Sequence, residues 1–293
     1  MAAMRTLRLI GRIVLAIAAG LFGYAAYIYL TLPDVRSLRT TNPTTTAFIE
    51  LRGDEARAKG EQPRRAQKWI SYARISPHLK RAVLVAEDSA FWQHEGIDFE
   101  QLKESMEVNI ERMAFARGGS TITQQLAKNL YLSPSKNPIR KLREFLIARR
   151  LESELSKQRI LELYLNVIEW GDGIYGAEAA ARAHFRKSAA ALSADEAALL
   201  AAAIINPRVL DPGHPTARLR RRQQMVMRRM GAVTPPPVVA TAPEPADPAD
   251  AGAPVPPAEP VALPSAPIPS LPGQVVPAPR PPGGRPPGGA QAR

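Results

Sequence analysis

The chain opens with an unbroken apolar run, and a long stretch with apolar residues at helical spacing comes later. Residues 13–32 contain no charged side chain and are almost entirely apolar or small. Twenty helical residues span about 30 Å, which is the thickness of the hydrocarbon core of a bilayer. Residues 33–75 are polar and show no clear periodicity. We therefore expect a transmembrane helix over 13–32, followed by a juxtamembrane segment over 33–75.

The residues around the apolar run favour an uncleaved anchor over a cleaved signal peptide. A signal peptide has a shorter apolar core, about 7–15 residues, and a small-residue cleavage site. Here the run ends in Thr-Leu-Pro-Asp-Val, which is a poor site. Arginines within residues 1–12 place this N-terminus in the cytoplasm and the remainder outside it, because positive residues stay inside. Arg36 and Arg39 follow the run and weaken that signal.

Residues 76–231 are expected to form one helical domain. Apolar residues recur at helical spacing after typical helix starts. The expected caps are Ser76 and Asn137, each followed by a proline, and Ser120 and Ser156. Ser193 and Glu196 fit a capping box. Convincing alternating strands are missing from the pattern, so the predicted fold class is mainly α. Helices are expected over 77–87, 98–115, 120–131, 137–155, 156–167 and from 193 to just before Pro207.

The composition changes abruptly near residue 232. The last 62 residues hold 20 of the 29 prolines, together with alanine, glycine and few large apolar residues. Such a segment cannot bury a packed core, so the sequence predicts an extended and largely disordered tail over 232–293. A spacer is the simplest interpretation, and a docking site for a protein partner is the alternative.

The net charge of +12 restricts the partners. Nucleic acid is the usual partner of so basic a chain, but the inferred topology argues against it, and anionic lipid or a phosphorylated lipid substrate fits better. The basic run from Arg218 to Arg222 is interpreted as a solvated helix face or a membrane contact. There is no cysteine, so the domain folds without disulfides.

Adjacent carboxylates at the end of an apolar helix are the first candidates for chemistry. Glu87 falls in the last turn of that helix, where partial loss of solvent raises the pKa of a carboxyl group. Asp88 raises this pKa further if the two charges face each other. A carboxylate tuned toward neutral pH can act as a general base. The alternative is that both residues are ordinary surface charges at a helix end.

A group of cations with one carboxylate predicts a site for an anionic ligand. Glu144 shares a helix face with apolar residues and follows Arg140, Lys141 and Arg143. Helix salt bridges would explain these residues if the cations had no other partner. Together with Lys128 and Lys136 they suit a pyrophosphate. Neutral donors at a nearby helix start, which also favours anions, are Ser120, Thr121, Gln124 and Gln125. The four histidines show no metal-ligand spacing.

These residues stand in ordered motifs that resemble the family 51 glycosyltransferases, the peptidoglycan polymerases. The resemblance covers residues 76–230, and the absence of a transpeptidase domain favours the monofunctional members. The chain departs from the family mainly at His184-Phe185-Arg186-Lys187, where the family often has Tyr-Phe-Gly-Lys. The matching segments are Glu87 to Gly96, Gly118 to Asn129, Arg140 to Glu152, Lys157 to Gly176 and Leu192 to Pro207.

The resemblance implies a lysozyme-like fold with a head lobe and a jaw lobe, and lipid II as substrate. Glu87 would take the proton from the acceptor 4-hydroxyl, and the reaction would invert the donor carbon to form a β-1,4 bond. Lys128, Lys136 and Arg140, with a divalent cation such as Mg²⁺ or Mn²⁺ as an optional helper, would neutralise the leaving pyrophosphate. Glu144, rather than the adjacent Asp88, would be the second functional carboxylate, and Asp88 would contribute to substrate binding.

The implied setting is the inner membrane of a bacterium, with a single-pass anchor and a periplasmic catalytic domain. Partners would be lipid II, the nascent glycan strand, the membrane and proteins of cell-wall synthesis or division. Two rival functions stay open. One is a lytic enzyme on the same fold, which would not need the cations for pyrophosphate. The other is an inactive scaffold that docks partners through its proline-rich tail.

Overall fold

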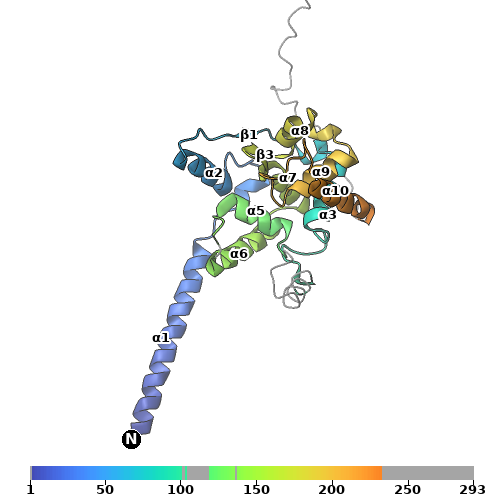
Figure 1. The fold of residues 1–293 in the computed structure, drawn as a ribbon. Coiled ribbons are helices and arrows are strands. Elements are labelled where there is room, and N and C mark those ends of the chain that lie inside the picture. The colour runs from blue at the N-terminus through green and yellow to red at the C-terminus, as the bar shows by residue number, and fades with distance from the viewer. Residues whose placement is uncertain (1, 101–102, 104–118, 136, 233–293) are drawn as a thin grey trace, which may run out of the picture. The chain divides into compact units, whose positions relative to one another are not determined.

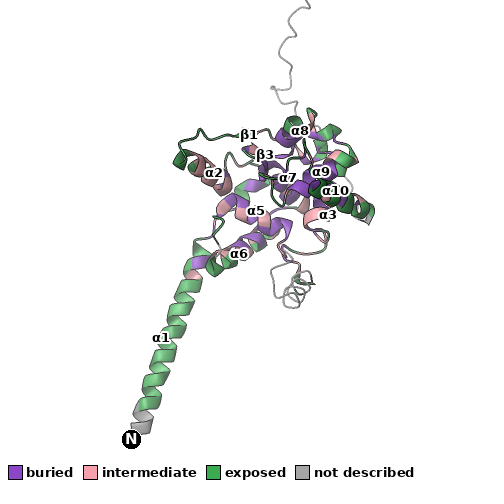
Figure 2. Cartoon of the chain, viewed as in Figure 1, coloured by how far each residue is buried: buried purple, intermediate pink, exposed green. Residues whose placement is uncertain are grey.

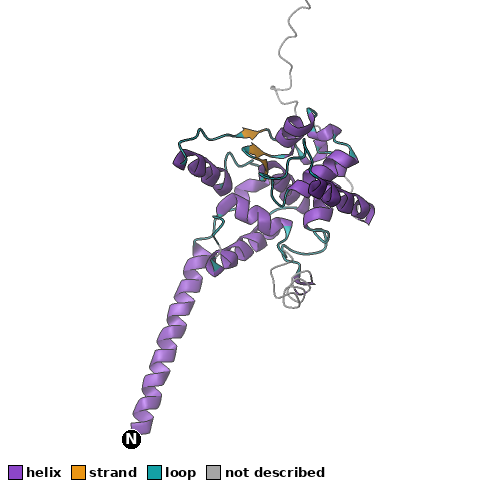
Figure 3. Cartoon of the chain, viewed as in Figure 1, coloured by secondary structure: helices purple, strands orange, loops and turns teal. Residues whose placement is uncertain are grey.

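The computed structural model of the protein describes residues 2–100, 103, 119–135 and 137–232 (Figure 1). The expected helix over 98–115 lies almost entirely outside these residues, as do Lys136 and the tail from residue 233 onward. The described part is mostly helical, which confirms the predicted fold class (Figure 3). The domain boundaries drawn from the sequence stay predictions.

The N-terminal helix α1 spans Ala2–Leu30, and its segment Thr6–Leu30 is long and apolar enough to cross a membrane. Its side chains are exposed almost throughout (Figure 2). The helix stops at Leu30, two residues before the expected end at residue 32, and Leu32 is buried in the core of the domain. Pro33 explains the early end, because the residue before a proline avoids the helical conformation.

The segment over 33–75 contains structure that its sequence did not predict. Helix α2 spans Ala47–Ala58 and starts at Thr46, whose hydroxyl accepts from the Ile49 amide at 3.1 Å. A short 3-10 turn, Arg36–Arg39, carries Leu38 into the core. Helix α2 has few apolar residues, so its sequence gives only a weak amphipathic pattern. Its stability comes from packing against α5.

Seven further helices lie among the described residues, and most of them were expected from the sequence. Predicted caps at Ser76, Asn137, Ser156 and Ser193 are confirmed. The helix expected to be capped by Ser120 is capped by Thr121 instead, in a capping box with Gln124. Helix α8 was not expected, and α10 was anticipated only as a helix face over Arg218 to Arg222. The helices are α3 (Pro77–Glu87), α5 (Ile122–Tyr131), α6 (Pro138–Glu154), α7 (Lys157–Val167), α8 (Ala177–Phe185), α9 (Ala194–Ala203) and α10 (Ala217–Arg229).

A small three-stranded sheet corrects the expectation of no strands. Strand β3 (Ile174–Tyr175) lies between β1 (Ala66–Gln67), to which it runs parallel, and β2 (Glu169–Gly171), to which it runs antiparallel (Figure 3). Strands of two or three residues are too short to show alternation. The chain leaves β3 through Gly176, where φ is +81° and a Cβ atom would lie 2.7 Å from the Asn166 carbonyl oxygen. Only glycine fits there.

The core lies between the helices that carry the candidate residues. Helix α9 packs against α3 and α10, while α5 packs against α6 and α7. Fully buried side chains such as Tyr164, Phe91, Leu126 and Leu151 fill the interior. The buried parts of the chain lie mainly in the packed helices rather than in α1 (Figure 2). The helix ends that hold Glu87 and Thr121 are therefore fixed by a packed core. Arg186 stands where the resembling family often has glycine. It follows the last turn of α8 with φ of +57°, a conformation that suits glycine, so this departure from the family pattern is local.

Candidate active site

Glu87 is the last residue of α3, and its carboxylate faces α5. Gln125 Nε2 donates to Glu87 Oε2 at 2.9 Å. The Tyr164 hydroxyl donates to Gln125 Oε1 at 2.9 Å, which turns the amide N–H toward Glu87. Burial raises the pKa of Glu87 above its usual value, while the bond from Gln125 and the charges of Arg222 and Lys128 oppose that rise. The carboxylate of Glu87 is therefore oriented by a hydrogen bond, and its pKa lies above the usual value.

Asp88 faces away from this pair and binds the start of α5. Its buried carboxylate accepts from the Ile122 amide at 2.9 Å and lies 3.0 Å from His94 Nε2. His94 Nδ1 in turn accepts from the Gly96 amide at 3.1 Å, as expected for a residue that orders this loop. At Gly96 φ is +85°, which favours glycine, and its carbonyl accepts from Thr121 Oγ1 at 2.7 Å. Asp88 thus joins the end of α3 to the beginning of α5.

Glu144 forms the centre of the cationic cluster. Its carboxylate is buried, Arg140 Nη1 lies 2.5 Å from its Oε2, and Lys141 binds its Oε1. Lys141 Nζ also lies 3.1 Å from Ser120 Oγ. Burial lowers the pKa of Lys128, Glu144 opposes that change, and Arg140 and Lys141 add to it. These residues from α5 and α6 therefore lie in one electrostatic group.

Lys128 interacts electrostatically with both Glu87 and Glu144. The charges of both Glu144 and Glu87 act on its pKa, so it lies within electrostatic reach of each. A cavity of about 260 Å³ is lined by Gln125, Lys128, Asn129 and Tyr164. Glu87 does not line it but accepts a hydrogen bond from Gln125, which does. A substrate in this cavity would contact Gln125, whose amide is bonded to Glu87, and Lys128, which interacts with Glu144.

Other predicted site residues have different contacts. Arg143 points to the end of the anchor helix, where its Nη2 donates to the Thr31 carbonyl at 3.0 Å. Thr121 and Gln124 bond to each other in the capping box of α5 and are buried. Substrate binding by these three residues and by Asp88 stays a prediction, and Lys136 lies outside the described residues.

Tyr164 and Arg222 act on the candidate site but were not predicted from the sequence. Arg222 was assigned to a solvated or membrane-facing surface, yet it is half-buried, and its Nε donates to the Ala202 carbonyl at 3.1 Å. The spacing could have revealed it, because Arg222 follows Leu219 by three residues and precedes Val226 by four, on the buried face of α10. Tyr164 gave no comparable signal, since a buried tyrosine in a helix is most often part of a core.

The described residues contain no group of three or more histidine, cysteine, aspartate or glutamate side chains that could hold a metal ion. Both oxygens of Glu144 are already in ion pairs, and Asp88 is bound to His94 and a backbone amide. The donor set therefore does not fit a resident divalent cation.

The fold and the site together define a class of protein. A helix of membrane length precedes a helical domain, and a carboxylate of raised pKa lies near a cluster suited to an anionic leaving group. These features fit a membrane-anchored protein with a candidate site for an anionic ligand.

The comparisons with known proteins identify the family. Residues 54–231, more than half of the chain, match the family model described as Transglycosylase. A Nitrosospira multiformis protein named biosynthetic peptidoglycan transglycosylase is 43% identical over 223 residues, which are 76% of this chain and 96% of the relative. A Dechloromonas aromatica protein of the same name is 48% identical over 191 residues, 65% of this chain and 83% of that relative. The chain belongs to the transglycosylase family.

Proposed function

We propose that this protein is a peptidoglycan glycosyltransferase that polymerises lipid II into β-1,4-linked glycan strands and releases polyprenyl pyrophosphate. The observation that carries the proposal is the Glu87–Gln125 pair, with Lys128 between it and the group of Arg140, Lys141 and Glu144. The names of the similar proteins from Nitrosospira multiformis and Dechloromonas aromatica support the same reaction.

Glu87 serves as the general base. Its carboxylate takes the proton of the acceptor 4-hydroxyl as that oxygen attacks C1 of the donor sugar. The bond from C1 to the pyrophosphate oxygen breaks on the opposite face, so the configuration inverts. Burial favours proton transfer by raising the pKa of Glu87. Gln125 holds the carboxylate in one orientation.

The cationic group stabilises the leaving pyrophosphate. Lys128, Arg140 and Lys141 supply positive charge from two helices. Lys136 is predicted from the sequence to add to this charge and lies outside the described residues. Glu144 orients Arg140 and Lys141 through its two oxygens. Charge that is fixed before the reaction stabilises the transition state without reorganisation. A Mg²⁺ or Mn²⁺ ion carried by the pyrophosphate stays a prediction of the family resemblance, and no step here depends on it.

Helix α1 anchors the enzyme at the surface where its lipid substrate is confined. Its apolar segment Thr6–Leu30 supports a single-pass anchor. The arginines before it favour a cytoplasmic N-terminus, and hence a periplasmic domain at a bacterial inner membrane. Protease treatment of spheroplasts tests this orientation: cleavage of the domain is expected, and protection of the domain in intact spheroplasts would contradict it.

Purified full-length protein with lipid II tests the proposed reaction. Wild-type protein should yield polymer and free polyprenyl pyrophosphate, and Glu87→Gln should lower the rate by about 10²–10⁴-fold. Circular dichroism should show that the variant keeps its fold. The matched control is Glu95→Gln, which removes an exposed carboxylate of the neighbouring loop and should leave the rate unchanged.

Two outcomes would overturn the proposal. Fragmentation of finished glycan without any polymer would identify a lytic enzyme. Wild-type rates for Glu87→Gln in the test tube would remove Glu87 from the chemistry, and a preserved cellular function of that variant would favour a scaffold.

A further inference from the structure

Three side chains form one line of hydrogen bonds that runs from helix α7 to helix α3. The hydroxyl of Tyr164 donates to Gln125 Oε1 at 2.9 Å, and Gln125 Nε2 donates to Glu87 Oε2 at 2.9 Å. Neighbouring members of this line lie 39 and 38 positions apart in the sequence. The tyrosine at its far end therefore reaches the proposed base through an amide.

The tyrosine end determines which way the amide points. Tyr164 is fully buried, and Gln125 is the hydrogen-bond partner of its hydroxyl among the described residues. Burial, with a smaller effect of the charges on Glu87 and Asp88, raises the pKa of Tyr164 well above its usual value. The hydroxyl therefore keeps its proton and needs an acceptor, because a buried donor without one is costly. The acceptor is the oxygen of the Gln125 amide.

With its oxygen bound to Tyr164, the amide presents only donors to Glu87. The oxygen of a glutamine amide accepts hydrogen bonds, and its NH2 group donates them. The NH2 group of Gln125 faces Glu87 Oε2 and also lies 3.5 Å from the Ser120 carbonyl oxygen. A flipped amide would turn its oxygen toward Glu87, which is favourable only when Glu87 carries a proton. Tyr164 opposes that flip and so favours the ionised carboxylate.

The other groups around Glu87 act in both directions. Burial has the largest effect and favours the protonated form, as does the adjacent Asp88. The hydrogen bond from Gln125 is the strongest influence in favour of the ionised form, ahead of the charges of Arg222 from α10 and Lys128 from α5. The charge state of Glu87 therefore depends more on the direction of this amide than on either cation.

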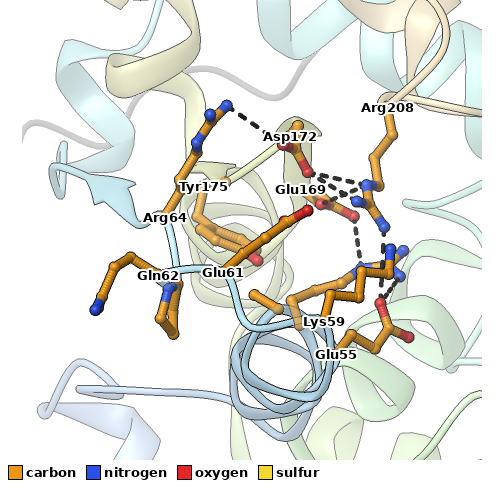
Figure 4. Close-up of a pocket in the computed structure, with 13 residues that line it drawn as sticks. Glu55, Lys59, Glu61, Gln62, Arg64, Glu169, Asp172, Tyr175 and Arg208 are labelled. Carbon is orange, nitrogen blue, oxygen red and sulfur yellow. Dashed lines mark hydrogen bonds and ion pairs between the residues drawn. The ribbon is translucent and has the colours of Figure 1, made fainter.

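Glu169 shows a different way of holding a buried carboxylate in the same protein. It lies at a cavity of about 370 Å³, where Figure 4 shows Glu169 and Asp172 facing Arg208. Burial raises the pKa of Glu169 too, but its Oε2 accepts from a guanidinium, Arg52 Nε, at 3.2 Å. A guanidinium can only donate, whereas an amide can present either end. Glu87 therefore needs a further residue to fix its donor, and Glu169 does not.

We propose that Tyr164 is a positioning residue that keeps the Gln125 NH2 group turned toward Glu87 and so makes Glu87 a base rather than an acid. The inference rests on the proposed function, in which Glu87 must begin the reaction without a proton. A lytic enzyme would need the opposite state, because its carboxylic acid must give a proton to the leaving oxygen. The direction of one amide thus separates the two kinds of chemistry at this carboxyl group.

The pH profile of kcat/KM for full-length protein with lipid II tests this role. In Tyr164→Phe the amide can flip and accept from protonated Glu87, so the acid limb should move to higher pH by about one unit. At a fixed pH on the limb, this shift is about a tenfold loss, while the high-pH plateau should stay within about threefold. The matched control is Tyr72→Phe, which removes a buried hydroxyl without a hydrogen-bond partner among the described residues. This control should leave the limb in place.

A double variant shows whether Tyr164 acts through Gln125. Gln125→Ala alone should move the limb to higher pH, and adding Tyr164→Phe should move it no farther, because the amide that Tyr164 orients is gone. Additive shifts would overturn the proposal, since Tyr164 would then act on Glu87 independently. Replacing Tyr164 with 3-fluorotyrosine keeps the ring and makes the hydroxyl a stronger donor. Because linked hydrogen bonds polarise one another, this replacement should move the limb to lower pH.

The outcomes separate the positioning role from the proposed function. An unmoved acid limb in Tyr164→Phe that is folded by circular dichroism would overturn the role while polymerisation continued. A lowered plateau without a shift would also overturn it, and would indicate that Tyr164 contacts the substrate in the cavity that it lines. If Tyr164→Phe does not fold, an unmoved limb in the 3-fluorotyrosine protein overturns the role instead. A failure of the proposed function would appear differently, as no polymer from the wild-type protein.

Discussion

The pKa of Glu87 is set by contacts that act in opposite directions. Burial raises it, and Asp88 adds a smaller rise, while Gln125, Arg222 and Lys128 lower it. The balance leaves a carboxylate that binds protons more readily than a free one but is still held by a hydrogen bond. A general base needs both properties, since it must accept a proton from a defined position.

The pH dependence of the rate follows from these contacts. Glu87 must be ionised to act as a base, so kcat/KM should fall on acidification through its raised pKa. The bond from Gln125 stabilises the ionised form, so Gln125→Ala should raise this pKa and move the acid limb to higher pH. Profiles of kcat/KM against pH measure the shift. Gln93→Ala, an exposed control, should leave the limb in place, and an unmoved limb in Gln125→Ala would contradict the prediction.

The contacts of Asp88 favour a role in stability over the substrate binding expected from the sequence. Asp88→Asn leaves the Ile122 amide and His94 with a poorer partner, so the free energy of unfolding should fall by about 1–3 kcal/mol. Thermal or denaturant unfolding measures this loss, and KM for lipid II should change little. An unchanged stability combined with a raised KM would instead assign Asp88 to substrate binding.

Helix α6 joins the candidate site to the membrane anchor. Arg140, Lys141 and Glu144 face the proposed pyrophosphate site from its first half. Farther along, Arg150 Nη1 donates to the Leu32 and Pro33 carbonyls at 3.3 and 3.2 Å, and its guanidinium lies 5.3 Å from the Tyr29 ring centroid. The end of α1 and the cationic cluster are thus attached to one rigid element.

This connection predicts a dependence on the form of the substrate. Combining Arg143→Ala with Arg150→Ala should slow polymerisation of lipid II in bilayers about tenfold, because small misplacements of binding groups are costly in rate. A short-chain lipid II analogue in detergent should be used at nearly the wild-type rate. Arg149→Ala is the control on the same helix, since Arg149 pairs with the exposed Glu95. Equal losses with both substrates would argue against the connection to the anchor.

At the scale of the whole molecule, the match to the transglycosylase family ends at residue 231, just where the proline-rich tail begins. The residues of the candidate site all precede it. Proteins of cell-wall synthesis or division stay predicted partners of this protein, and a spacer or a docking site stay the two interpretations of the tail.

Deletion of residues 232–293 should therefore leave lipid II polymerisation by the purified protein within about twofold of the full-length rate. The same gel assay of polymer formation measures it, and circular dichroism checks that the shortened protein is folded. Abolished turnover by a folded, shortened protein would mean that the tail is part of the catalytic unit.

The sequence by itself determined the features that depend on local spacing. Capping residues located α3, α6, α7 and α9, because a cap and the helix it starts are adjacent in the chain. Spacing also brought Arg140 and Glu144 together, since residues four apart share a helix face. The identity of Glu87 as a carboxylate at the end of an apolar helix is likewise a local property.

Only the tertiary structure decided what each side chain faces. Gln125 meets Glu87 across 38 positions of sequence, and Asp88 reaches Ile122 across 34. Arg143, one position before Glu144, turns instead to Thr31, 112 residues away. The cavity beside Glu169 is enclosed by segments from three parts of the chain. Such contacts arise from the packing of helices around a common core, and no periodicity along the sequence encodes them.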